Sequence, residues 1–227
     1  DARDLAQVAR LLADHEVEAS LYPLGEQAGV PLLLLGANRF SPELVQAIKG
    51  QEWDIDVCHL AILPTLGEPG LLVMDMDSTA IRIECIDEIA RLAGVGDQVA
   101  AVTAAAMQGK LEFADSLRSR VALLEGAPVT ILDEVAAAMP WMPGLQLMVD
   151  TLKQSGWTVA IASGGFTRFA GELQQALGLD AIFANELAVE GGLLTGKVSS
   201  PIVDAAAKAE ALLQLARDHG IPAAQTV

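Results

Sequence analysis

The apolar and polar positions of the chain change their pattern at about Gly70. Before it, helical spacing of apolar residues alternates with short continuous runs such as PLLLLGA at residues 31–37, which is typical of a buried strand. The segment SPELVQAIKG, residues 41–50, opens with a Ser cap and an early Pro and closes on Gly, as helices do. The predicted order is helix, strand, strand, helix, strand, over residues 1–16, 17–23, 31–37, 41–50 and 54–63.

After Gly70 the pattern becomes that of an α/β domain. Near-continuous apolar strands at 71–75, 157–163 and 181–185 are separated by helical stretches at 86–138, from 166 and at 203–219, and EGGLLTG at 190–196 indicates a hairpin turn. This alternation predicts a parallel sheet that helices cover on both faces. The stretch 86–138 is too long for a simple crossover and indicates an inserted helical cap.

The two patterns predict two domains. Residues 1–68 have the order of a ferredoxin-like split unit without its first strand, a small α+β domain. Residues 69–227 are expected to form a Rossmann-like α/β core with the cap inserted at about 86–140. At 227 residues and 52% hydrophobic residues, the chain is long enough for both cores.

Composition excludes several classes of partner. The 14 basic residues against 30 acidic ones give a field that repels nucleic acid and anionic lipid, so an anionic small substrate needs local cations. We find no apolar run of bilayer length and no secretory signal, and we expect a cytoplasmic protein without a membrane partner. Cys58 and Cys85 lack the spacing of metal ligands, which favours reduced thiols.

Candidate chemistry lies where two predicted strands end. Asp75 and Asp77, in DMDST, follow one strand, and Ser163 and Gly164, in SGG, follow another. Either motif alone is also compatible with an ordinary turn that caps a helix. Together, at the ligand-binding edge of a parallel sheet, they fit phosphate chemistry: Asp75 as nucleophile, Asp77 as acid and base, and Ser163 with the Gly164 amide as phosphate donors.

Two cations interrupt apolar helical stripes. Lys208 lies in line with Leu212 near the start of a predicted helix, where the helix dipole disfavours it, so it needs an anion. A solvent-facing lysine paired with Asp204 or Glu210 stays an alternative. Arg120 interrupts the stripe of Phe113, Leu117 and Leu124, and is either a structural salt-bridge residue or a clamp for a carboxylate or phosphate.

These residues carry a resemblance. From about residue 70 to 227, the chain resembles the phosphoserine phosphatases of the haloacid dehalogenase superfamily, with DMDSTAI, ECIDEIA, FADSLRSRV, SGGF and AAAKAE in family order and spacing. The resemblance implies that Glu84 holds the substrate ammonium, Arg120 holds its carboxylate, Phe113 closes over it, and Lys208 neutralises the aspartyl phosphate. Glu84 as a surface charge and Phe113 as plain core are the alternatives.

The resemblance also implies a Mg²⁺ cofactor, bound through Asp75 and Asp77. Family members follow the last helix with a strand and an acidic GDGxND-type loop that completes the metal site. This sequence stops at AAQTV, where that strand would begin. We therefore expect that the given stretch is part of a longer protein, and that by itself it lacks magnesium-dependent activity.

The function implied is Mg²⁺-dependent hydrolysis of O-phospho-L-serine to L-serine and phosphate, the last step of serine biosynthesis, through an aspartyl phosphate. One alternative is a phosphatase or phosphotransferase that acts on another small phosphomonoester. Another is a binding or regulatory module, since residues 1–68 resemble ACT-like amino-acid-sensing domains. The sequence leaves the oligomeric state open, a homo-oligomer included.

Overall fold

The computed structural model describes residues 2–27, 30–55, 63–199 and 201–227. The chain divides into two compact units, Asp1–Leu63 and Pro64–Val227. The division lies near the domain boundary that the sequence predicts after residue 68. Among the described residues, every helix is too short or too polar to cross a bilayer.

The described residues of the first unit form two helices and a two-stranded antiparallel sheet: α1 (Ala2–Asp14), β1 (Ala19–Gln27), β2 (Val30–Ala37) and α2 (Pro42–Lys49). Ser41 caps α2 by accepting a hydrogen bond from the Leu44 amide at 3.2 Å, as the sequence predicts. The small core of the unit is built on Leu12, Val17, Leu44 and Ile48. The first four predicted elements are confirmed. The fifth, at 54–63, falls mostly on 56–62, outside the described residues, so the ferredoxin-like arrangement stays a prediction.

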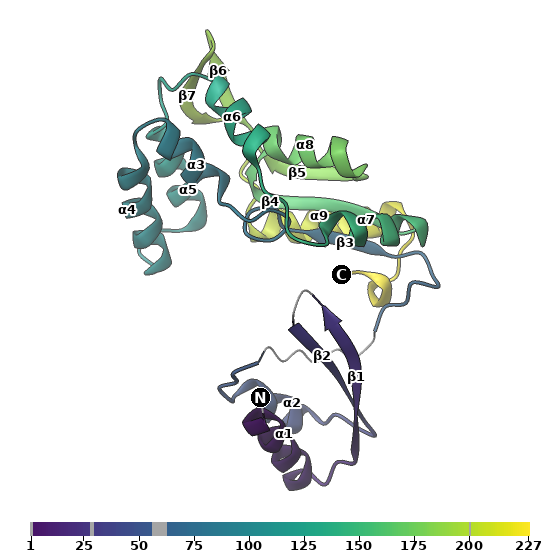
Figure 1. Ribbon diagram of the computed structural model, residues 1–227. Helices are drawn as coiled ribbons and strands as arrows, with labels where there is room; N and C mark the ends of the chain where they lie inside the picture. Colours follow the sequence, from purple (N-terminus) through teal and green to yellow (C-terminus); the bar gives the residue numbers. More distant parts are fainter. Residues whose placement is uncertain (1, 28–29, 56–62, 200) are drawn as a thin grey trace. The chain divides into compact units, whose positions relative to one another are not determined.

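The second unit is built on a parallel sheet in the order β3–β4–β5, shown in Figure 1. Its strands are β3 (Leu71–Met74), β4 (Thr158–Phe166) and β5 (Ala181–Asn185). After a short 3₁₀ turn (Ala223–Gln225), Thr226 forms a parallel bridge with Leu71, and the Val73 amide donates to the Val227 carbonyl at 2.9 Å. Residues 226–227 thus pair with β3 in the parallel orientation that the strands of the sheet share.

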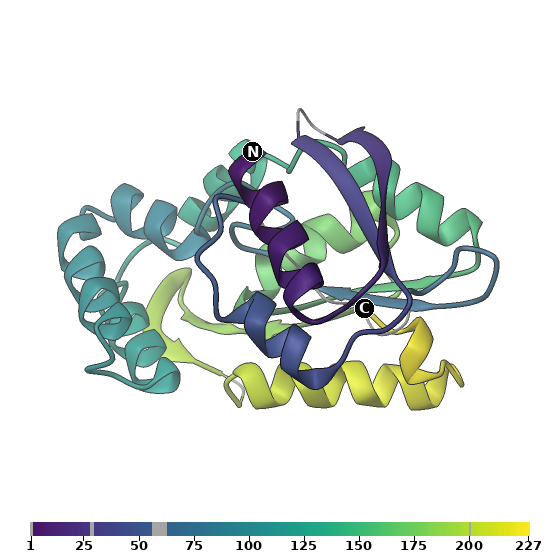
Figure 2. The same cartoon turned by 90° about the horizontal axis from the view of Figure 1, so that it is seen from below.

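Helices cover both faces of this sheet, as predicted (Figure 2). Alternate residues of β4 point to opposite sides: Val159 and Ile161 pack with α7 (Leu145–Gln154) and α8 (Thr167–Leu177), whereas Ala160 packs with α9 (Ala205–Asp218). The sequence analysis does not predict α7. Its buried Leu145 and Val149 and the half-buried Leu152 follow helical spacing, so the signal for this helix is present in the sequence and the prediction omits it.

The cap consists of four helices: α3 (Cys85–Leu92), α4 (Gly96–Met107), α5 (Phe113–Ala122) and α6 (Thr130–Ala138). The segment that leads into the cap and the segment that leads out of it are hydrogen-bonded to each other. The Arg82 amide donates to the Pro140 carbonyl and the Met142 amide donates to the Ala80 carbonyl, both at 2.9 Å. The predicted hairpin is formed by β6 (Leu187–Glu190) and β7 (Leu193–Val198). Its Leu194 exchanges backbone hydrogen bonds with Gly126 and Ala127 of the cap.

The start of β3 depends on a close contact between Gly70 and the buried indole of Trp157. A Cβ atom at Gly70 would lie 2.5 Å from Trp157 Cε2, which the packed ring has no room to avoid. We expect Gly70→Ala to lower the free energy of unfolding by about 1–3 kcal/mol in urea titrations. The matched control is Gly171→Ala, in α8, where the new Cβ has nothing within 4 Å and should stabilise the helix by roughly 0.5–1 kcal/mol. Equal effects of the two substitutions would contradict this packing argument.

Candidate active site

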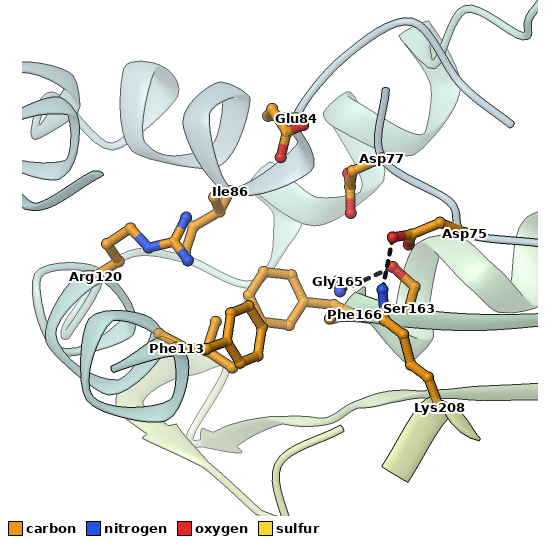
Figure 3. A pocket seen from close by; sticks show the side chains of 12 residues that line it. Asp75, Asp77, Glu84, Ile86, Phe113, Arg120, Ser163, Gly165, Phe166 and Lys208 are labelled. Atoms are coloured by element: carbon orange, nitrogen blue, oxygen red, sulfur yellow. Dashed lines mark hydrogen bonds and ion pairs between the residues drawn. The ribbon is translucent and has the colours of Figure 1, made fainter. Parts of the chain in front are cut away.

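A cavity of about 160 Å³ lies where the carboxyl ends of β3 and β4 face the cap. Figure 3 shows the side chains that line it, which come from the β3–α3 connection, α3, α5, the end of β4 and α9. All eight residues that the sequence singles out line this one cavity: Asp75, Asp77, Glu84, Phe113, Arg120, Ser163, Gly164 and Lys208. Their assigned roles stay predictions, but their convergence is a property of the fold.

Asp75 directly follows β3 and is held from two sides. The Met76 amide donates to its Oδ1 at 2.7 Å, and Lys208 Nζ donates to its Oδ2 at 2.5 Å. Lys208 lies in the first turn of α9, whose N-cap Asp204 instead accepts a hydrogen bond from the Ala207 amide. The anion that pairs with Lys208 is therefore Asp75, and not Asp204 or Glu210 as in the solvent-facing alternative.

Asp77 lies beside Asp75 in a less solvated position. Its Oδ1 accepts a hydrogen bond from the Cys85 amide at 2.8 Å. Burial raises the pKa of the Asp77 carboxyl, the negative charges of Glu84 and Asp75 act in the same direction, and the hydrogen bonds from Cys85 oppose them. A carboxyl group that holds its proton more readily than usual, beside the lysine-paired carboxylate of Asp75, fits the acid of an acid–base pair.

Ser163, Gly164 and Gly165 form the end of β4, where the pairing with β5 shifts register before α8 begins at Thr167. The Gly165 amide donates to the buried Ser163 Oγ at 3.0 Å, which leaves the hydroxyl hydrogen available for a ligand. A Cβ at Gly164 would lie 2.6 Å from the Phe113 ring, and one at Gly165 would overlap the Asp77 carboxylate. Both glycines let other site residues approach the backbone closely.

The opposite side of the cavity carries Glu84, Phe113 and Arg120 (Figure 3). Glu84 accepts a hydrogen bond from the Ser78 hydroxyl at 2.7 Å. Arg120 Nε donates to the Ser116 carbonyl at 3.4 Å, and its guanidinium forms no ion pair with a residue that the structure describes. Phe113 is 43% exposed, which is incompatible with its alternative reading as plain core.

Comparisons with known proteins show the family of the chain. The family of haloacid dehalogenase-like hydrolases matches residues 72–227. The chain belongs to this family. It is 50% identical over 174 residues to a phosphoserine phosphatase of Haemophilus influenzae, covering 77% of this chain and 55% of that protein. A phosphoserine phosphatase of Idiomarina loihiensis is 52% identical over 158 residues, with 70% and 72% covered.

A solved structure described as a phospho-aspartyl intermediate analogue of phosphoserine phosphatase superposes with a TM-score of 0.66 at 40% identity, covering 70% of this chain and 76% of that one. The chain spans about half the length of the Haemophilus relative.

Four lining residues are absent from the sequence-based list of site residues: Ile86, Leu117, Gly165 and Phe166. The sequence contains one indication of these four residues, which is their closeness to residues that it already singles out. Leu117 shares a helical face with Phe113 and Arg120, Ile86 follows Glu84 by two positions, and Gly165 and Phe166 complete SGGF. Apolar lining residues are hard to separate from core residues by pattern alone, because both interrupt polar stretches in the same way.

Haloacid dehalogenase-like phosphatases generally use a divalent metal. The Asp75 carboxylate and the Asp77 backbone carbonyl are hard oxygen ligands that suit such an ion. Among the described residues, no group of three or more His, Cys, Asp or Glu side chains is arranged to hold a metal. Asp75 and Asp77 therefore fit part of a metal site, and an octahedral ion needs further oxygen ligands.

The raised pKa of Asp77 predicts a pH-dependent effect on stability. Ionising the Asp77 carboxyl costs more free energy in the folded chain than in the unfolded chain. This loss of stability is absent below the ordinary carboxyl pKa and develops as the pH rises from that value through the raised pKa of the folded chain. We expect Asp77→Asn, whose amide oxygen can still accept from Cys85, to raise the free energy of unfolding near neutral pH and to lose this gain at acid pH. Urea titrations at several pH values without divalent metal measure it.

Asp87→Asn, at an exposed position of α3, should show no such gain. Destabilisation by Asp77→Asn that is the same at every pH would contradict the burial argument.

Proposed function

We propose that the protein hydrolyses O-phospho-L-serine to L-serine and phosphate, with Mg²⁺ as cofactor and an aspartyl phosphate as intermediate. The observation that carries this proposal is the division of one small cavity into two ends. The ion pair of Asp75 and Lys208 lies beside Ser163, and Glu84 and Arg120 line the other side. The names of the relatives support the same reaction.

At the phosphate end, the Asp75 carboxylate attacks phosphorus, and the bond from phosphorus to the serine oxygen breaks. Asp77 gives its proton to the departing alkoxide and later takes a proton from the water that hydrolyses the acyl phosphate. The Ser163 hydroxyl donates to the phosphate, and Lys208 offsets its negative charge. Asp75 and the Asp77 carbonyl would be among the ligands of a bound Mg²⁺, which would supply further neutralisation of negative charge.

At the amino-acid end, opposite charges match the substrate. Glu84 pairs with the ammonium group and Arg120 with the carboxylate, while the Phe113 ring covers the substrate from the cap. The guanidinium of Arg120 has no carboxylate partner among the described residues, which leaves it available for one from a ligand. We further propose a cytoplasmic location. We also propose that nucleic acid is not a partner, because 30 acidic residues against 14 basic ones repel its phosphate backbone.

Phosphate release from phosphoserine by the full-length protein, with Mg²⁺ and with EDTA, tests the proposal. We expect turnover only with the metal, and transient labelling of the protein by phosphate that is lost in Asp75→Asn. That variant should lose roughly a thousandfold or more of the turnover, because it lacks the nucleophile. Asp97→Asn, on the exposed surface of α4, is the control. Phosphoserine binding without turnover in the full-length protein would favour the binding-module alternative.

Arg120 separates substrate recognition from chemistry. We expect Arg120→Ala to lower kcat/KM for phosphoserine by roughly ten- to a hundredfold, because a charge-assisted hydrogen-bonded pair is lost. Phosphoethanolamine, which lacks the carboxylate, should be hydrolysed equally by both proteins. The control is Arg118→Ala on the same helix, since Arg118 is exposed and pairs with Asp115 at 3.2 Å. Equal losses on both substrates would assign Arg120 a structural role.

A further inference from the structure

We propose that Asn185 is a positioning residue that holds the phosphate-binding end of the cavity in its active arrangement. The inference rests on the proposed phosphate chemistry, and it concerns a residue that does not line the cavity. Asn185 is the last residue of β5 and is fully buried, with 0% of its surface exposed. A buried amide in an otherwise apolar layer is costly unless both of its ends are hydrogen-bonded.

Both ends of the Asn185 amide are bonded, and to two separate segments of the active site. Its Nδ2 donates to the Gly164 carbonyl at 2.8 Å, and its Oδ1 accepts from the Val203 amide at 2.9 Å. A carbonyl can only accept and a backbone amide can only donate, so these partners determine which end of the side chain is which. One side chain therefore connects the SGG segment with the segment that leads into α9.

The first contact determines how the peptide between Gly164 and Gly165 is turned. In a trans peptide the C=O and N–H groups point in opposite directions. Because Asn185 holds the Gly164 carbonyl, the Gly165 N–H is directed away from Asn185, and it donates to Ser163 Oγ at 3.0 Å. That hydrogen bond occupies a lone pair of the hydroxyl and orients its hydrogen toward a phosphate.

The second contact anchors the start of α9. Val203 directly precedes Asp204, whose side chain caps the helix through the Ala207 amide, and the Lys208 amide donates to the Asp204 carbonyl at 2.9 Å. Lys208 therefore lies one helical turn after Asp204, the residue next to the anchored Val203, and its Nζ reaches Asp75. Asn185 thus sets the position of Ser163 relative to Lys208, the two groups expected to hold the same phosphate.

Two substitutions separate these contacts. In Asn185→Asp the carboxylate still accepts from Val203 but cannot donate to Gly164, so the α9 anchor is kept and the SGG anchor is lost. Asn185→Leu, of similar volume, removes both. The control is Gln174→Leu, since Gln174 also donates from a partly buried side chain to a backbone carbonyl next to β5, that of Leu179, without any link to the cavity.

The experiment measures thermal unfolding, kcat/KM for phosphoserine, and inhibition by the two products, inorganic phosphate and L-serine, in the full-length protein. For both Asn185 variants we expect a folded protein, inhibition by phosphate that is weaker by roughly tenfold, and kcat/KM that is lower by ten- to a hundredfold. Inhibition by L-serine should change less than about twofold, because no hydrogen bond among the described residues joins Asn185 to Glu84 or Arg120. Gln174→Leu should change neither inhibition constant.

A residue with a purely structural role gives another pattern, in which the variants bind both inorganic phosphate and L-serine more weakly. That pattern, or normal kinetics of the folded fraction, or unfolding of both Asn185 variants, would overturn the inference. Failure of the proposed function is recognised separately, as a wild-type protein without phosphoserine turnover. In that case the affinity for inorganic phosphate, measured by calorimetry in wild type and variants, still decides the role of Asn185.

Discussion

The active site depends on the parallel pairing of β3 with β4. Parallel pairing places the carboxyl ends of both strands at one edge of the sheet, so Asp75 and Ser163, 88 positions apart in the chain, line one cavity. An antiparallel pairing of the same strands would have placed them at opposite edges. The packing of Gly70 on Trp157 and the helices on both faces maintain this pairing, and the residues proposed to hold substrate are arranged around it.

Local charge opposes the overall charge of the molecule. A chain with a formal net charge of −16 repels an anion at long range, and the paired aspartates at the site would do so at short range. Lys208 and Arg120 supply positive charge on opposite sides of the cavity, one on the α/β core and the other on the cap. A substrate that carries phosphate at one end and an amino acid at the other has anionic groups for both.

The cap and the core contribute different parts of the proposed reaction. The core holds Asp75, Asp77, Ser163 and Lys208, which in the proposed reaction act on phosphate and do not distinguish one phosphomonoester from another. The α3 and α5 region holds Glu84, Phe113 and Arg120, which contact the rest of the substrate in the proposed complex. Variation in the cap can therefore change substrate choice while the chemistry of the core is kept.

The sequence by itself determined most of the described strands and helices and six of the eight candidate site residues. The reason is that apolar periodicity, caps and chemically distinctive residues are local signals. In a parallel α/β sheet, the carboxyl ends of neighbouring strands lie at the same edge, so residues that follow these strands come together. The resemblance to a known family supplied Glu84 and Phe113, which as a surface charge and an apolar residue carry no distinctive local signal.

Only the tertiary structure decided which partners these residues have. The pairing of Lys208 with Asp75 rather than with Asp204 spans 133 positions and depends on how α9 packs under the sheet. The raised pKa of Asp77 depends on burial, which the chain acquires only when the cap and the SGG segment close around it. Asn185 shows the same limit most clearly: an asparagine at the end of a strand reads as a turn residue, and only folding brings its amide between two segments of the active site.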